Sequence, residues 1–106
     1  MEKLKNLLDK EGYLLNLNDW DEEIAHHLAT LEDITLTDNH WEIIYLLRDF
    51  YQEFQVSPAM RPLVKAVSKK LGADKGKSIY LMTLFPGSPA KLIAKLAGLP
   101  KPENCI

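Results

Sequence analysis

The sequence contains a single cysteine in 106 residues, which excludes a fold held together by disulfide bonds. It also lacks any apolar run near the ~18 residues that a membrane-spanning helix requires. The first residues, MEKLKNLLDKEGYLL, place acids among short apolar pairs and contain no small-residue cleavage site, unlike a secretory signal. These absences predict a cytoplasmic protein that does not act in a membrane.

The composition is that of a folded domain. Hydrophobic residues make up 46% of the chain and charged residues 26%, a balance typical of globular proteins rather than disordered ones. The length allows one domain with one core. We therefore expect a single domain over residues 1–106, with a folded body at 1–98 and a C-terminal arm at 99–106.

The net charge of −2 conceals a division between the two halves of the chain. Residues 1–56 contain four Lys or Arg against thirteen Asp or Glu, and residues 57–106 contain nine against two, so the halves carry −9 and +7. Such a split indicates either two halves that attract each other across the fold or a surface field directed at a partner. Both interpretations remain open here.

The fold class expected from the pattern is mainly α, with a small N-terminal β-hairpin and about five helices in a compact orthogonal bundle. Residues 9–18 (DKEGYLLNLN) predict the hairpin, because a glycine turn precedes a short apolar run. Apolar spacing predicts four longer helices, and a shorter one over residues 78–85. Their expected first residues or caps are Asp21, Thr37, Ser57 with Pro58, and Ser88 with Pro89.

The helix beginning after Thr37 is apolar around more than half of its circumference, so we expect it at the centre of the domain. The last helix should end at Gly98, with Pro100 as a stop. Beyond it, KPENCI has no periodicity, and its two prolines favour an extended backbone. We expect this arm to be mobile.

Several familiar motifs are incomplete. The segment DKGKS ends like a phosphate-binding loop, but Leu71 stands where that motif requires its first glycine. The three histidines lack chelate spacing, so we expect no metal, and no cofactor motif is present. The adjacent acids at residues 22–23 fit a helix first turn better than acid–base catalysis. The region 41–71 could form a DNA-reading helix pair, but its outward positions lack Asn and Gln, which disfavours DNA binding.

The single cysteine, Cys105, is the strongest candidate for chemistry. Cysteine is among the most buried residue types, yet this one lies on the expected arm, where oxidation threatens an idle thiol. A thiolate can attack a sulfane sulfur, hold it as a persulfide and pass it on. Sequence spacing alone leaves sulfur carriage and a bystander thiol about equally plausible.

The segments EGYL, HWEIIYLLRDFYQEF, SPAMRPLVKA and KGKSIYLMTLFPGSPAKLIAKLAGLPKPENCI resemble the DsrC/TusE family, related to the gamma subunit of dissimilatory sulfite reductase. The resemblance runs from about Gly12 to Ile106. It implies a helical domain with a small N-terminal β meander and a swinging arm whose penultimate cysteine carries sulfur. That position is Cys105.

Family members that work with the reductase have a second arm cysteine about ten residues upstream, and residues 92–96 here contain none. The chain therefore resembles the one-cysteine, TusE-type branch. The resemblance implies a sulfurtransferase that accepts sulfur from a TusBCD-type complex and passes it to an MnmA-type enzyme for tRNA 2-thiouridine synthesis. The alternatives are a redox module that forms mixed disulfides through Cys105, or a protein associated with sulfite reductase.

Basic residues could face a partner protein or its bound tRNA. They alternate with the apolar positions of the two basic helices or lie in the arm. The candidates are Arg61, Lys65, Lys69, Lys91, Lys95 and Lys101.

Overall fold

The computed structural model describes residues 6–102, and within that range it contains five α-helices, one short 3-10 helix and no strand. The 3-10 helix η1 comes first, and the α-helices follow in chain order. Their bounds are η1 Leu17–Asp19, α2 Glu22–Leu31, α3 Asp38–Phe54, α4 Met60–Leu71, α5 Ser78–Leu84 and α6 Pro89–Leu96. None of these helices is both long and apolar enough to cross a membrane.

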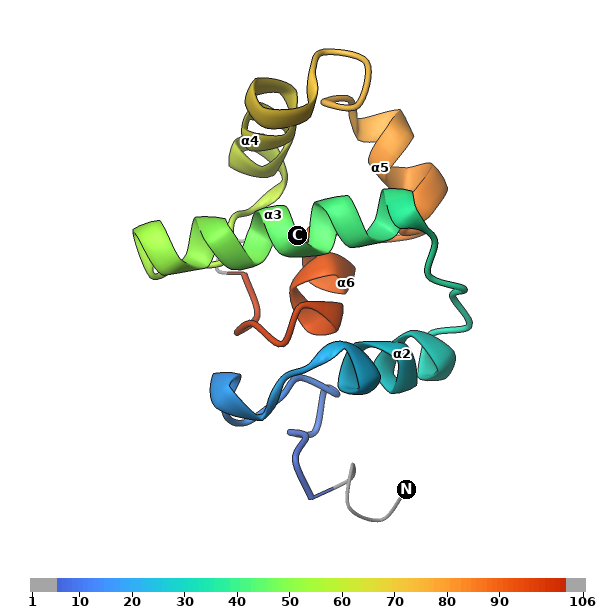
Figure 1. Ribbon diagram of the computed structural model, residues 1–106, viewed down its shortest axis with the longest axis vertical. Coiled ribbons are helices and arrows are strands. Elements are labelled where there is room, and N and C mark those ends of the chain that lie inside the picture. The colour runs from blue at the N-terminus through green and yellow to red at the C-terminus, as the bar shows by residue number, and fades with distance from the viewer. Residues whose placement is uncertain (1–5, 103–106) are drawn as a thin grey trace.

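The helix α6 lies at the centre, between α3 on one side and α2 on the other (Figure 1), and it also packs against α4. Its sequence explains this position, because small alanines together with Ile93 and Leu96 give it a wide buried face. Helix α3 was expected at the centre. Helix α3 is the longest helix, but its C-terminal residue Phe54 is 55% exposed. The end of α3 therefore extends out of the core, whereas α6 contacts three other helices.

The predicted N-terminal β-hairpin is wrong. Residues 6–16 form a turn with one isolated antiparallel bridge, between Leu8 and Leu14, and no strand. The Asp9 carboxylate accepts hydrogen bonds from the backbone N–H groups of Glu11 and Tyr13, at 2.9 Å each, which closes a side-chain-driven turn. Tyr13 and Leu14 are both buried although they are adjacent, so the run lacks the alternation of a strand.

Most helix ends follow the predicted caps. The Asp21 carboxylate accepts from the N–H of Ile24 at 2.8 Å, and Thr37 precedes α3 as predicted. Helix α4 differs, because it begins at Met60 with Ala59 as its cap. The expected cap, Ser57, uses its hydroxyl elsewhere.

Candidate functional site

The candidate nucleophile, Cys105, lies outside the described residues. Six contacts fix the chain that leads to it, from the end of α6 to Pro102. Within the described residues, the candidate site consists of this leading segment, residues 97–102, and the surface beside it.

The end of α6 is held from two other elements. The Nε1–H of Trp20 donates to the carbonyl of Leu96 at 2.8 Å, and Nη1 of Arg48 donates to the carbonyl of Ala97 at 2.6 Å. The Arg48 guanidinium also lies over the Trp20 ring, 4.0 Å from its centroid. Burial lowers the pKa of Arg48, and the ordinary value is high enough that the group stays charged. These bonds satisfy carbonyls that a helix C-terminus leaves unpaired.

The turn after α6 depends on Gly98, which has a φ of +73°. The N–H of Leu99 bonds to the carbonyl of Ala94 at 2.9 Å, and that of Gly98 to the carbonyl of Lys95 at 3.2 Å. This pair of bonds defines a Schellman motif, whose left-handed position favours glycine. The turn sends Leu99 into the core, where it is 2% exposed.

Residues 100–102 belong to no helix or strand and lie against the body. The Ser57 hydroxyl donates to the carbonyl of Pro100 at 2.6 Å, and Nζ of Lys101 is 3.0 Å from Oε2 of Glu11. Pro102 is buried. The packed chain therefore extends at least to Pro102, four residues past the expected boundary between body and arm.

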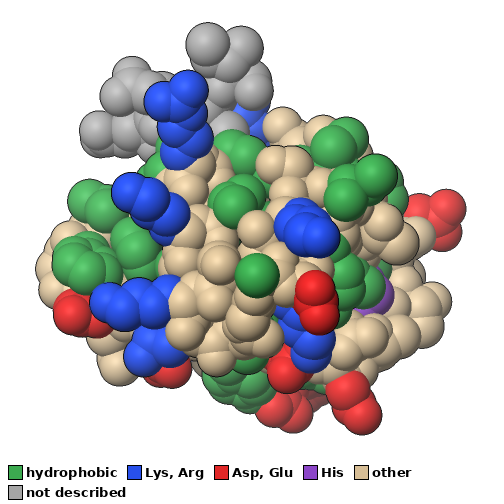
Figure 2. All heavy atoms as spheres, turned by 90° about the horizontal axis from the view of Figure 1, so that it is seen from above, with side chains coloured by type: hydrophobic (Ala, Val, Ile, Leu, Met, Phe, Trp, Pro, Cys, Tyr) green, Lys and Arg blue, Asp and Glu red, His purple; other side chains and the backbone are tan. Residues whose placement is uncertain are grey.

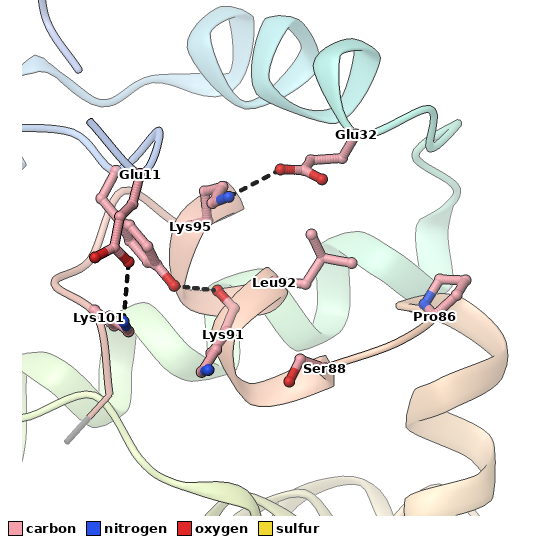
Figure 3. Close-up of a pocket in the computed structure, with 9 residues that line it drawn as sticks. Glu11, Glu32, Pro86, Ser88, Lys91, Leu92, Lys95 and Lys101 are labelled. Atoms are coloured by element: carbon pink, nitrogen blue, oxygen red, sulfur yellow. Dashed lines mark hydrogen bonds and ion pairs between the residues drawn. The ribbon is translucent and has the colours of Figure 1, made fainter. Parts of the chain in front are cut away.

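A pocket of about 290 Å³ lies beside this segment and contains three of the six predicted basic residues, Lys91, Lys95 and Lys101 (Figure 3). The Tyr13 hydroxyl donates to the carbonyl of Lys91 at 3.3 Å, and Nζ of Lys95 is 2.9 Å from Oε1 of Glu32. The remaining lining residues are Glu11, Pro86, Ser88 and Leu92. Two carboxylates offset two of the three ammonium groups, so this pocket is only weakly basic.

The other predicted basic residues lie elsewhere. Arg61 and Lys65 line a larger groove of about 560 Å³ by the first half of α4, and Lys69 is exposed further along that helix. The six residues thus form two groups, one in or beside the leading segment and one on α4. Sequence reasoning missed Ser57, Glu11 and Trp20 as anchors. Only their three-dimensional positions, far from residues 96–101 in sequence, reveal that role.

The histidines have structural contacts. The ring of His40 is 2.9 Å from the carbonyl of Leu84 through Nε2, and its Nδ1 accepts from the N–H of Thr37 at 3.1 Å. His26 packs edge-on against Trp41. In residues 6–102, no group of three or more His, Cys, Asp or Glu side chains could hold a metal ion.

Fold and site define a small helical domain that anchors, next to its core, the chain segment leading to a lone thiol. The match to the family model "DsrC like protein" covers residues 1–106, and the chain belongs to that family. The resemblance drawn from the motifs is confirmed.

Curated relatives support a sulfurtransferase role in a sulfur relay. The "Sulfurtransferase TusE homolog" of Haemophilus influenzae is 61% identical over 98 residues, which cover 92% of this chain and 90% of the relative. "Sulfurtransferase TusE" of Photorhabdus laumondii is 57% identical over 98 residues, with coverage of 92% and 88%.

Solved structures of the family share the fold. The NMR structure of Allochromatium vinosum DsrC has a TM-score of 0.85 and 52% identity, covering 93% of this chain and 88% of that one. The crystal structure of the oxidized gamma subunit of dissimilatory sulfite reductase from Archaeoglobus fulgidus has a TM-score of 0.80 and 41% identity, covering 93% and 90%.

Proposed function

We propose that this protein is a sulfur carrier in which Cys105 accepts, holds and releases one sulfur atom as a persulfide. The observation that carries the proposal is the anchoring of the leading segment as far as Pro102, directly ahead of the chain's only thiol. Three residues span at most about 11 Å, which bounds the distance from Pro102 at which the Cys105 thiol can react. The TusE relatives named above support the same role.

Each transfer is a displacement at sulfur. The Cys105 thiolate attacks the terminal sulfur of a donor persulfide, the donor S–S bond breaks, and the donor thiolate leaves. Cys105 then bears the S–SH group. In the second step an acceptor thiolate attacks that terminal sulfur and the Cys105 thiolate leaves, so the two steps involve no net oxidation and need no cofactor.

The partners in this proposal are a TusBCD-type donor complex and an MnmA-type thiouridylase that modifies the wobble uridine of tRNA. The basic residues are proposed to contact these partners or the bound tRNA. Lys101 lies in the leading segment and Lys91 and Lys95 line the pocket beside it, whereas the α4 residues lie on a separate surface, so the two groups can serve different contacts.

The experiment that tests this function is a reconstituted relay. A donor complex loaded with ³⁵S-persulfide, an MnmA-type enzyme and tRNA are incubated with the wild-type protein or with Cys105→Ser. The proposal predicts ³⁵S-labelled 2-thiouridine with the wild type and at most background with the variant. Equal labelling with Cys105→Ser would refute the carrier role, because sulfur would then reach tRNA without this thiol.

A further inference from the structure

An open groove lies between the first half of α4 and the start of α5. Both helices lie on the opposite side of α3 from α2 (Figure 1). Helix α4 packs on α3 and α6, and the loop over residues 72–77 then leads to α5. The groove has a volume of about 560 Å³. Its described lining residues are Met60, Arg61, Pro62, Val64, Lys65 and Ser78.

The apolar lining residues of the groove come from α4, and exposed apolar side chains of α5 follow its lining residue Ser78. Met60 and Val64 are one helical turn apart on α4, so they share a face. On α5, Met82 is one turn after the lining residue Ser78 and is 47% exposed, and Ile79 is 75% exposed. Large aliphatic side chains this exposed, on the helix that contributes Ser78 to the groove, are typical of a docking surface.

A basic row runs beside the apolar one. Arg61, Lys65 and Lys69 follow each other at intervals of four residues on α4, so they lie along one stripe. From Ser57 to Leu84 the chain has six Lys or Arg and one acid. Figure 2 shows Lys and Arg side chains gathered next to hydrophobic ones on this face.

From this arrangement we infer that the groove binds an acidic amphipathic helix of a partner protein, with its apolar side chains on Met60, Val64 and Met82. Carboxylates on the flank of that helix would then meet the basic stripe. Single-stranded nucleic acid fits less well, because such sites stack bases on aromatic rings and no described lining residue is aromatic. The inference deepens the proposed sulfur relay by describing a partner's chemistry, but its test does not depend on sulfur transfer.

The test uses a fluorescein-labelled helical peptide with leucines at i, i+3, i+4 and i+7 and glutamates on the flanking positions. Binding to the full chain is followed by fluorescence anisotropy. We expect saturable binding, and chemical-shift changes in ¹H–¹⁵N spectra that centre on residues 60–65 and 78–82. A peptide with lysine in place of each glutamate should bind at least about tenfold more weakly.

Two double variants separate groove binding from general attraction. Arg61→Glu with Lys65→Glu should weaken peptide binding about tenfold or more, whereas Lys10→Glu with Lys70→Glu should weaken it about twofold or less. Both pairs change the net charge equally, and the control residues are exposed and do not line the groove. Ile79→Ser with Met82→Ser should also weaken binding, without loss of helical circular dichroism.

Three outcomes would overturn the inference. The first is the absence of saturable binding up to about 1 mM peptide. The second is an equal loss of peptide affinity in the two charge-reversed double variants. The third is a poly(U) 20-mer that binds more tightly than the peptide and depends on the same residues. Sedimentation of the protein alone checks a fourth case. Self-association that Arg61→Glu with Lys65→Glu abolishes would assign the groove to a second copy of this chain and overturn the inference as well.

Discussion

Glu11 and Lys101, from opposite ends of the chain, form an ion pair with 3.0 Å between Oε2 and Nζ. Both side chains are about half exposed, so the pair adds little to the free energy of unfolding. Its effect is to position the last described residues before Cys105. Together with the bond from Ser57 to Pro100, it ties the leading segment to the N-terminal turn and to the start of α4.

Removing this ion pair should therefore change stability very little. We expect Glu11→Gln to lower the free energy of unfolding by less than about 1 kcal/mol, because the charges are solvated and screened. Urea unfolding measures this, with Glu53→Gln as a control at an exposed acid for which no ion pair is described. A loss of about 3 kcal/mol would show that the segment is part of the cooperative core.

Gly98→Ala should be strongly destabilising. A Cβ there would lie 2.5 Å from Cδ1 of Trp20, and the positive φ disfavours any L side chain. Strain and overpacking together should cost about 2–4 kcal/mol. The matched control is Gly87→Ala, where φ is +93° but no atom lies within 4 Å of the new Cβ, so the backbone strain alone costs about 1 kcal/mol. Similar melting temperatures for the two variants would contradict this account of the turn.

Arg48→Lys tests the anchoring of the α6 C-terminus. A lysine cannot both stack its head on Trp20 and donate to the Ala97 carbonyl with the same fork geometry. We expect a loss of about 1–2 kcal/mol in the free energy of unfolding, measured in urea. Arg61→Lys is the control, because Arg61 is exposed, and it should be nearly neutral. Equal effects of the two variants would show that the contacts of Arg48 are unimportant.

Deleting residues 104–106 should stop sulfur transfer but leave partner docking in place. Three residues bury too little surface for a stable interface, so docking should depend on the folded body. Surface plasmon resonance with an immobilised donor complex, next to a transfer assay, separates the two effects. Docking lost together with transfer would make the deleted residues themselves the recognition element.

The sequence predicted the helices well, because the capping residues and the apolar spacing that indicate a helix lie within or next to the helix itself. Asp21 caps α2, and Ser88, Pro89 and Gly98 bracket α6 as predicted. The hairpin prediction failed because strand pairing there is limited to the single bridge between Leu8 and Leu14, while the buried Tyr13 contacts α6. The Tyr13 hydroxyl, for example, bonds to the Lys91 carbonyl. A short apolar run does not reveal which element it will contact.

The site was only partly predictable for the same reason. The motif singled out Cys105, but the residues that anchor the chain before it are distant in sequence. Ser57 looked like a helix cap, yet its hydroxyl bonds to Pro100. The predicted basic residues fall into two groups, one on α4 and one formed by Lys91, Lys95 and Lys101, which line a different pocket.

The most direct test of the central claim is mass spectrometry of the C-terminal peptide after incubation with a persulfide donor. Carriage on Cys105 predicts added mass in steps of one sulfur atom, about 32 Da, that a reductant removes and that Cys105→Ser does not show. The C-terminal peptide contains the only cysteine, so the assignment is unambiguous. An unmodified wild-type peptide, or only a mixed disulfide with the donor that gives no persulfide, would contradict the account.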